Sequence, residues 1–414
     1  MQKTLIGISS LLAGIGILLF GHGLMGTLLS LRAIAEGYQE STIGIIMSMY
    51  FLGFICGTFL CPRLIRQVGH IRTLAALAAI GASVSILQGL WISVFGWSIM
   101  RFISGLCMVG IFMVIESWLN SQVPNLIRGR IFGLYVLINL VFLAASQFLL
   151  LAGDIGTLNL FAIAAALFSL SLVPVALTRL PEPAPVQNVR PRLRDLYRTS
   201  PLGMAGCFLS GLMGSAFWAF APLFAERTGL AEFGIAIFMS TTILGGVVWQ
   251  YPIGLLSDRT DRRLTIMLVG FIMAFAALLA TFSPAGQSIW LSSCLFVLGG
   301  MMFSVYPLSV AHANDHPGVD DPLTLATSLL LINGIGAAFG PISAGILLHW
   351  YGYNSLMGYF SIMGLLLGGF AWYRRRYGVE ITVDQQTSFV PLTRTSQVLA
   401  EGIYGDETGV RSET

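Results

Sequence analysis

Ionisable side chains inside apolar stretches are the first candidates for chemistry in this chain. His22 lies within FGHGLMG, Arg101 within WSIMRFISG and Glu116 within VIESWLN. A charge in such surroundings is costly unless it is compensated, and it often marks a substrate, ion or proton pathway. Histidine titrates near neutral pH, so His22 is a candidate proton carrier. A hydrogen bond across a helix interface, next to Gly21 and Gly23, explains it equally well.

Arg101 and Glu116 each have two interpretations. A bare arginine charge inside a membrane costs at least about 2.5 kcal/mol, so Arg101 needs an acid, backbone carbonyls, water or an anionic solute beside it. Packing against polar neighbours is favoured over contact with an anionic substrate. Glu116 is expected near the arginines of residues 63–72, and an ion-paired gate residue is favoured over a proton carrier because a paired carboxylate stays ionised.

Neutral polar and aromatic residues in the middle of apolar stretches are candidates for lining a solute cavity. We expect Asn139, Trp218 and Asn333 to line it, although such residues are also common contacts between helices. Together with His22 and Arg101 they form the predicted substrate or proton pathway.

Metal and enzyme chemistry find little support in the sequence. His312 and His316 flank Asp315, a combination that could bind a metal, but without further ligands a solvated loop is the better interpretation. The chain has no phosphate-binding glycine loop with a lysine, and no stretch long enough for a nucleotide-binding domain. We therefore expect no enzymatic activity, no cofactor and no metal site.

The elements that must position these residues follow from composition. The chain has 414 residues, of which 56% are apolar and 10% charged, whereas soluble domains average about 25% charged residues. Mean hydropathy is +0.81. Such a chain cannot cover itself against water, so it belongs in a bilayer. The net charge of +3 is too small to indicate nucleic-acid binding.

A helix that crosses a membrane needs about 20 mostly apolar residues. Twelve stretches qualify, approximately 5–31, 41–62, 71–93, 95–119, 130–151, 159–178, 203–225, 233–257, 264–283, 288–311, 323–349 and 354–373. The sequence thus predicts an all-α integral membrane protein with two six-helix bundles, residues 1–178 and 203–376. A linker at 179–202 joins them, and a polar tail at 377–414 is expected to be largely disordered.

Arginine placement predicts the orientation, because cytoplasmic loops carry the excess of basic residues. Loops on one side hold arginines at 63, 66, 72, 128, 130, 179, 190, 192, 194, 198, 259, 262, 263 and 374–376. Loops on the other side hold only Arg32 and Arg227. Both termini are therefore expected in the cytoplasm, and the apolar N-terminal stretch is expected to be a retained helix rather than a signal peptide.

Two basic loops occupy equivalent places in the two halves. GTFLCPRLIRQVGHIR begins at Gly57 and GLLSDRTDRR begins at Gly254, 197 residues later. The second loop resembles the G-x-x-x-D-R-x-G-R-R signature of the major facilitator superfamily, with Asp261 in place of a glycine. The residues that match are Gly254, Asp258, Arg259, Arg262 and Arg263.

Further strings narrow the resemblance. Arg101 and Gly105 fit a second element of the superfamily, R-x-x-x-G. The strings IESWLN, RGRIFGLY, WQYPIGLLSDR, VAHAND and FVPLTRTS resemble a bacterial YcaD-like branch along the length of the chain. The resemblance implies an inner-membrane carrier that works by alternating access. It implies no particular substrate.

The resemblance also implies a gate at the cytoplasmic side. In the superfamily, the loop of the second half faces the start of the fifth helix, which here holds Arg128 and Arg130. We expect Asp258 to hold this side shut in the outward-open state, using the partial positive charge of a helix start. Glu116 and Asp315 are each expected to face the arginine loop of their own half. A static loop that only sets topology is the alternative.

Three functions remain open at this point. The leading one is secondary transport of a small organic solute, with proton coupling suggested by His22 and Glu116. Efflux of amphiphilic compounds or lipids is the second. The third is a sensor or assembly factor on a carrier fold, whose tail string FVPLTRTS docks a partner. In each case we expect a monomer in contact with membrane lipid in a bacterial inner membrane, and no nucleic-acid partner.

Overall fold

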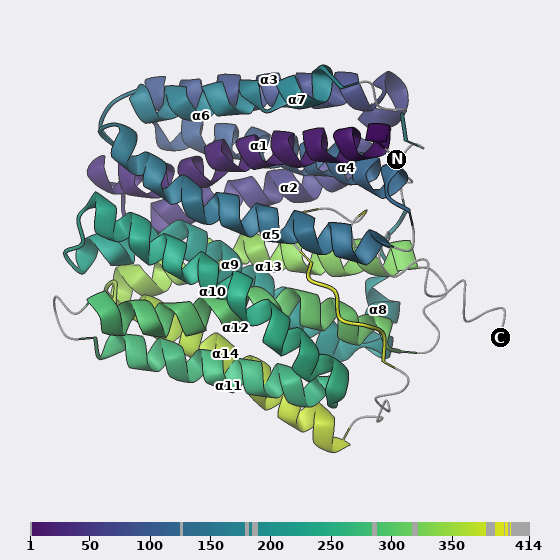
Figure 1. Cartoon of the computed structure of the whole chain (residues 1–414). Helices are drawn as coiled ribbons and strands as arrows, with labels where there is room; N and C mark the ends of the chain where they lie inside the picture. Colours follow the sequence, from purple (N-terminus) through teal and green to yellow (C-terminus); the bar gives the residue numbers. More distant parts are fainter. Residues whose placement is uncertain are drawn as a thin grey trace.

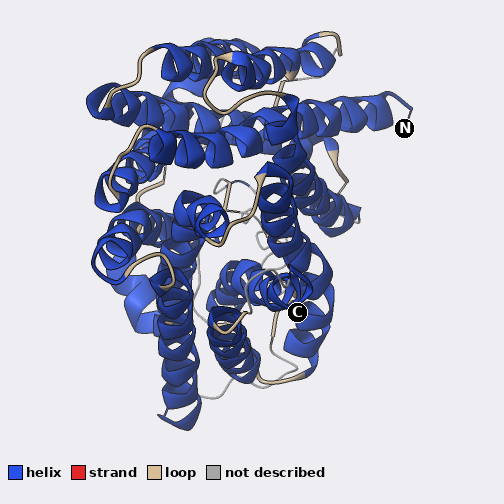
Figure 2. Cartoon of the chain, turned by 90° about the vertical axis from the view of Figure 1, so that its left-hand side faces the viewer, coloured by secondary structure: helices blue, strands red, loops and turns tan. Residues whose placement is uncertain are grey.

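The computed structural model describes residues 2–124, 127–178, 182–183, 189–283, 288–316, 322–377, 386–392, 394–395 and 398. Regular structure in these residues is helical throughout, as Figure 2 shows. Among the described residues, twelve helical spans are long and apolar enough to cross a membrane. The predicted fold class and the number of spans are therefore confirmed.

The first half contains six spans. Four are single helices: α1 (Gln2–Ala35), α2 (Glu40–Val68), α3 (His70–Leu90) and α4 (Val94–Gln122). The fifth span is α5 (Arg128–Ser146) with the short 3-10 helix η2 (Gln147–Ala152), and the sixth is α6 (Asn159–Leu170) with α7 (Leu172–Ala176). Several helices run beyond the predicted apolar stretches because their arginine-bearing ends stay helical.

The second half contains the other six. After the short linker helix α8 (Leu193–Thr199) come α9 (Pro201–Arg227), α10 (Glu232–Arg259), α11 (Arg262–Thr281), α12 (Ser288–Asn314), α13 (Pro322–Tyr351) and α14 (Ser355–Tyr377). In Figure 1 the helices α1–α7 form the upper bundle and α9–α14 the lower one. The main contacts within the bundles are α2 with α4, α9 with α13, α10 with α12 and α11 with α14.

Two turns in the basic loops show how local sequence sets the helix ends. Gly69 has φ 86°, a conformation that favours glycine, and it separates α2 from α3. Asp261, which stands where the superfamily signature has glycine, is the N-cap of α11, and its carboxylate accepts a bond from the backbone N–H of Arg263 at 2.9 Å. At this position a side-chain cap starts the helix, where the signature has the conformational freedom of glycine.

The linker contacts both bundles. Glu182 Oε1 accepts a hydrogen bond of 2.8 Å from the backbone N–H of His70 at the start of α3. This bond holds the pKa of Glu182 below its ordinary value. The backbone N–H of Arg192 donates to Ser328 Oγ of α13 at 2.9 Å. The connection between the halves is thus fixed at both sides.

The two bundles pack directly against each other at the end away from the basic loops. Ser30 Oγ of α1 donates to the carbonyl of Ala219 in α9 at 2.6 Å, and Ser240 Oγ of α10 donates to the carbonyl of Ala144 in α5 at 2.7 Å. His349 of α13 lies 3.7 Å from Glu40 at the start of α2. This end, which carries Arg32 and Arg227, is closed by contacts between helices.

Candidate functional site: a central cavity and its basic mouth

A cavity of about 190 Å³ lies between the two bundles. Its walls come from α1, α2, α4 and α5 of the first half and from α9, α10, α12 and α13 of the second. All five residues of the predicted pathway line this one cavity: His22, Arg101, Asn139, Trp218 and Asn333. Their part in transport stays a prediction, but the structure brings them together from three helices of the first half, α1, α4 and α5, and two of the second, α9 and α13.

Most of these side chains are oriented by specific contacts. His22 Nε2 lies 3.5 Å from the hydroxyl of Tyr50, and the Arg101 guanidinium carbon lies 4.6 Å from the centre of the Tyr50 ring. Asn139 Nδ2 donates to the carbonyl of Tyr135 at 2.7 Å. Asn333 Nδ2 donates to the carbonyl of Cys207 at 2.9 Å. The polar groups are therefore held in place before any solute binds, which favours selective binding.

The cavity also contains residues that the sequence analysis did not assign to the pathway. Tyr50 and Phe303 are aromatic residues in apolar helices, and their sequence context does not distinguish them from aromatic residues of the bundle core. Gln250 is a polar residue of the same kind as Asn139, so its polarity was a usable signal. Arg394 and Thr395 come from the tail, and their position depends on a fold of the tail that hydropathy does not predict.

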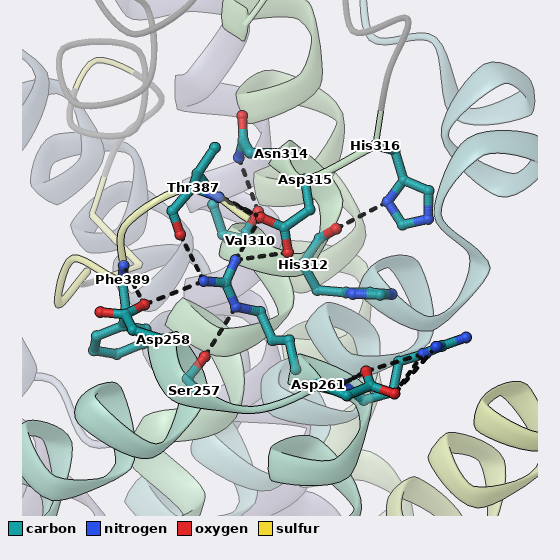
Figure 3. A network of polar contacts seen from close by, with 12 residues as sticks. Ser257, Asp258, Asp261, Val310, His312, Asn314, Asp315, His316, Thr387 and Phe389 are labelled. Atoms are coloured by element: carbon teal, nitrogen blue, oxygen red, sulfur yellow. Dashed lines mark hydrogen bonds and ion pairs between the residues drawn. The ribbon is translucent and has the colours of Figure 1, made fainter. Parts of the chain in front are cut away.

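At the basic end of the molecule, Arg262 is the centre of a buried polar network (Figure 3). Its side chain is 1% exposed, and Nη1 lies 2.7 Å from both carboxylate oxygens of Asp315. Nε donates to Ser257 Oγ at 2.9 Å, while Nη2 donates to Asp258 at 3.3 Å and to the carbonyl of Thr387 at 2.7 Å. Three predicted gate residues thus meet in one network.

The network includes a segment from the tail, which we call the inserted segment: Gln386–Leu392 with residues 394 and 395. The backbone N–H and the hydroxyl of Thr387 each donate to Asp315 Oδ1 at 2.9 Å. The backbone N–H of Phe389 donates to Asp258 Oδ1 at 2.8 Å. At the far end of the segment, the Thr395 hydroxyl donates to Glu116 of α4 in the other bundle. The segment therefore bridges the two halves.

Figure 1 shows the inserted segment as a yellow trace between the upper and lower bundles. The expectation of a disordered tail is wrong for these residues. Apolar side chains explain the difference: Leu392 is 3% exposed, and the Phe389 ring packs against Gly254, where a Cβ would collide with it. A short apolar stretch inside a polar tail can bury surface only by docking onto the bundles, which is favourable.

Other predicted gate residues are placed differently. Glu116 is fully buried, and its partners include Thr395 and the hydroxyl of Tyr135, which donates to it at 2.8 Å. Among the described residues, Asp258 bonds Arg262 and Phe389, and the start of α5 with Arg128 and Arg130 is not among its partners. The latch was predicted for an outward-open state, so it stays a prediction.

The two remaining arginines of the loop differ in their surroundings. Arg259 is exposed at the end of α10. Arg263 is buried, and its Nε lies 3.0 Å from Asp261 Oδ1. Arg263 therefore takes part in fixing the turn between α10 and α11, whereas Arg259 is free to meet solvent or a headgroup.

Electrostatics at Asp315 depend on the inserted segment. Burial raises the pKa of Asp315 above its ordinary value, while the Arg262 guanidinium and the two bonds from Thr387 oppose the rise. Removing Thr387 would thus make the ionised carboxylate less favourable.

The two histidines beside Asp315 contact each other's residue: His316 Nδ1 lies 2.9 Å from the carbonyl of His312. No group of three metal-ligating side chains occurs among the described residues.

Comparisons with known proteins agree with this architecture. The family described as Major Facilitator Superfamily matches residues 11–322. An uncharacterized MFS-type transporter of Enterobacter sp. (strain 638) is 27% identical over 350 residues, which cover 84% of this chain and 90% of the relative. The uncharacterized MFS-type transporter YcaD of Escherichia fergusonii is also 27% identical, with the same coverage.

Solved structures with low sequence identity share the fold. The nucleoside transporter NupG is similar with a TM-score of 0.71 and 15% identity, over 91% of this chain and 100% of that one. A bacterial homolog to the human lysosomal transporter Spinster, in an inward-facing and unoccupied conformation, is similar with a TM-score of 0.74 and 12% identity, over 93% and 99% of the two chains.

Proposed function

The chain belongs to the Major Facilitator Superfamily, and we propose that it carries a small organic solute by alternating access through the cavity between its bundles. As an MFS-type transporter it is a multi-pass membrane protein and not an enzyme. One observation carries the proposal: a cavity with a few polar side chains in its wall is lined by helices of both halves. Carriers of this kind bind solute near the membrane midplane, at the interface of their repeats.

The arrangement of contacts supports an inward-facing conformation. The bundles pack directly against each other at the end with few arginines, through Ser30, Ser240 and His349. At the other end the inserted segment lies between them. We assign the arginine-rich end to the cytoplasm of a bacterial cell and the chain to its inner membrane, because basic loops stay on the cytoplasmic side. Both termini are then cytoplasmic.

A proton gradient is the driving force we propose. His22 is the one titratable histidine in the cavity wall, and its ring contacts Tyr50 at the edge of the Arg101 site. Protonation of His22 would place a second positive charge near Arg101, so the proton and the state of the solute site would be coupled. Transport linked to a proton gradient needs such a coupling between two sites.

Asp258, Arg262 and Asp315 serve as the gate of the cytoplasmic side in this proposal, with Glu116 as its counterpart in the first half. In the outward-open state we expect Asp258 to exchange the N–H of Phe389 for the start of α5, near Arg128 and Arg130. The carboxylate at the end of α10 can accept bonds from backbone N–H groups in either state.

Solute exchange in proteoliposomes tests the function. Purified full-length protein is first screened against a metabolite library by thermal unfolding, because a solute that binds the folded state raises its midpoint. Each stabilising solute is then loaded inside proteoliposomes, and uptake of the labelled solute by exchange is measured. We expect saturable exchange for at least one solute. Stabilised protein that exchanges none of its ligands would support the sensor interpretation instead.

A further inference from the structure

We propose that the cavity takes a small organic anion, whose negative charge is bound by Arg101. This inference rests on the proposed transport function and names the solute class of the same site. Arg101 is 7% exposed, so its guanidinium is almost completely removed from solvent. Its Nε has no hydrogen-bond partner in the described part of the chain. A buried charge without sufficient partners is unfavourable, and a bound anion would compensate it.

The guanidinium carbon of Arg101 lies over the Tyr50 ring. The distance from the Arg101 Cζ to the ring centre is 4.6 Å, which gives a cation–π contact. This contact uses none of the N–H donors of the guanidinium in a hydrogen bond to a side-chain oxygen. Because a guanidinium presents a planar fork of donors, it suits a carboxylate or phosphate group. The unpartnered Nε is one of those donors.

No acid lines the cavity among the residues that the structure describes. Its formally charged lining groups are Arg101 and Arg394, and Nη2 of Arg394 also has no hydrogen-bond partner there. Glu116 is not part of the wall and accepts bonds from Tyr135 and Thr395. Two cations facing a small space of low polarity repel each other, so an anion is the solute that this space favours.

The other lining residues indicate the chemistry of the uncharged part of the solute. The wall contains both aromatic and amide side chains: Tyr50, Phe51, Phe54, Trp218, Phe303, Asn139, Gln250 and Asn333. The volume of about 190 Å³ is below the roughly 300–1,000 Å³ of pockets for drug-sized ligands. The site therefore fits a small carboxylate or phosphate ester with an apolar or aromatic part.

Probes matched in shape and different in charge test the class of solute. Thermal unfolding of the purified full-length chain is measured with benzoate, benzamide and benzylamine, and with hexanoate, hexanamide and hexylamine. We expect a carboxylate to raise the midpoint by about 2 °C or more, and its amide and amine partners to have no such effect. Arg101→Gln should remove the stabilisation, and Arg101→Lys should keep part of it.

Arg227→Gln is the matched control, since Arg227 is an exposed arginine that does not line the cavity. Equal stabilisation by all three charge types would overturn the proposal, as would failure of both carboxylates or a carboxylate effect that survives in Arg101→Gln. If neutral probes bind and are exchanged in proteoliposomes, the proposed transport function is supported and the proposed anionic solute is contradicted. If no probe or library solute is exchanged, the transport function is contradicted.

A second inference rests on the contacts of the tail. We infer that the inserted segment is a removable plug that closes the basic mouth of the cavity. Its Thr387 and Phe389 bind the second bundle at Asp315 and Asp258, and its Thr395 binds the first bundle at Glu116. Leu392, Arg394 and Thr395 form part of the cavity wall. Solute can leave toward the basic end only when this segment withdraws.

The plug occupies groups that the gate itself requires. Asp258 Oδ1 accepts the Phe389 N–H, and Arg262 donates to the Thr387 carbonyl, so the segment covers groups of the proposed gate. If Asp258 exchanges the Phe389 N–H for the start of α5, as proposed above, closing this side and seating the segment are alternatives. Two alternative partners for one group form a two-state element, which other ligands can bias.

Labelling of a cavity cysteine tests the plug. The five native cysteines are replaced, Asn333→Cys is introduced, and the rate of reaction with a membrane-impermeant maleimide added from the basic side is measured in oriented vesicles. We expect Thr387→Ala combined with Phe389→Ala to raise this rate about tenfold or more, because the segment loses two side-chain anchors on the second bundle. These are the bond from the Thr387 hydroxyl to Asp315 and the packing of the Phe389 ring against Gly254. Truncation after residue 377 should raise it further.

A cysteine introduced at Tyr197, which is exposed on the linker helix α8 at the basic end, provides the control and should react equally in all variants. Size-exclusion chromatography shows whether the truncated chain is folded, and the double substitution decides the question if it is not. An unchanged rate at position 333 in a folded variant that lacks these anchors would overturn the inference.

Discussion

Nη1 of Arg262 lies 2.7 Å from both carboxylate oxygens of Asp315, and each side chain is 1% exposed. The pair joins the start of α11 to the residue that follows α12, and both partners also bind Thr387 of the tail. An arginine that the superfamily signature places in a gate loop is thus also the anchor of a buried network. We therefore expect stability and the proposed gating to depend on the same side chain.

We expect Arg262→Ala to destabilise the protein strongly, because it leaves the Asp315 carboxylate buried without its cation. Breaking a buried pair in this way typically costs about 3–5 kcal/mol. Thermal unfolding in detergent measures the change. Arg259→Ala is the control from the same loop, since Arg259 is exposed, and it should shift the midpoint little. Equal midpoints for the two variants would mean that the pair contributes nothing net.

Close helix crossing predicts the effect of a single methyl group at Gly105. A Cβ there would collide with the backbone carbonyl of Tyr50, where α4 crosses α2. Gly105→Ala should therefore destabilise by about 1–3 kcal/mol through overpacking. Gly133→Ala, where a Cβ would meet nothing within 4 Å, should be neutral or slightly stabilising. Thermal unfolding of both variants compares them directly, and a neutral Gly105→Ala would show that the crossing is looser than described.

Replacing His22 should separate binding from coupling. Since His22 contacts Tyr50 in the cavity wall, we expect His22→Gln to retain solute exchange but to lose accumulation driven by a pH gradient. A glutamine can hydrogen-bond in its place but cannot carry a proton near neutral pH. Parallel exchange and gradient-driven uptake assays measure the two activities. Accumulation that persists in the variant would assign the coupling to another group.

Asp258→Asn tests the gate. The amide keeps an oxygen acceptor for the Phe389 N–H but loses the charge that strengthens this bond and the contact with Arg262. We expect normal membrane insertion with transport reduced by about tenfold. Asp195→Asn, an exposed acid in the linker helix α8, should leave transport unchanged. Full transport in Asp258→Asn would mean that the loop serves only to set topology.

The sequence was sufficient for the fold because hydropathy reports directly on membrane spans. It also indicated some of the residues that line the cavity, since His22, Arg101 and Asn139 are polar groups in apolar helices and such groups usually face the interior of a bundle. The 197-residue repeat assigned Asp315 to the arginine loop of its own half, and the structure places it against Arg262.

What the sequence did not indicate depends on contacts between distant parts of the chain. Thr395 binds Glu116 across 279 residues, and Thr387 binds Asp315 across 72. A polar tail has no periodic pattern that would predict docking, and its apolar residues Phe389 and Leu392 are too few to form an element of their own. The partner of Glu116 was therefore sought among nearby arginines and was found in part in the tail.

The position of the inserted segment in the chain has a consequence for biogenesis. It follows all twelve spans, so the ribosome releases it only after both bundles have entered the membrane. A newly inserted carrier would consequently pass through a period in which its inner vestibule is open to the cytosol. A protease that removes the tail would return the mature protein to the same open state.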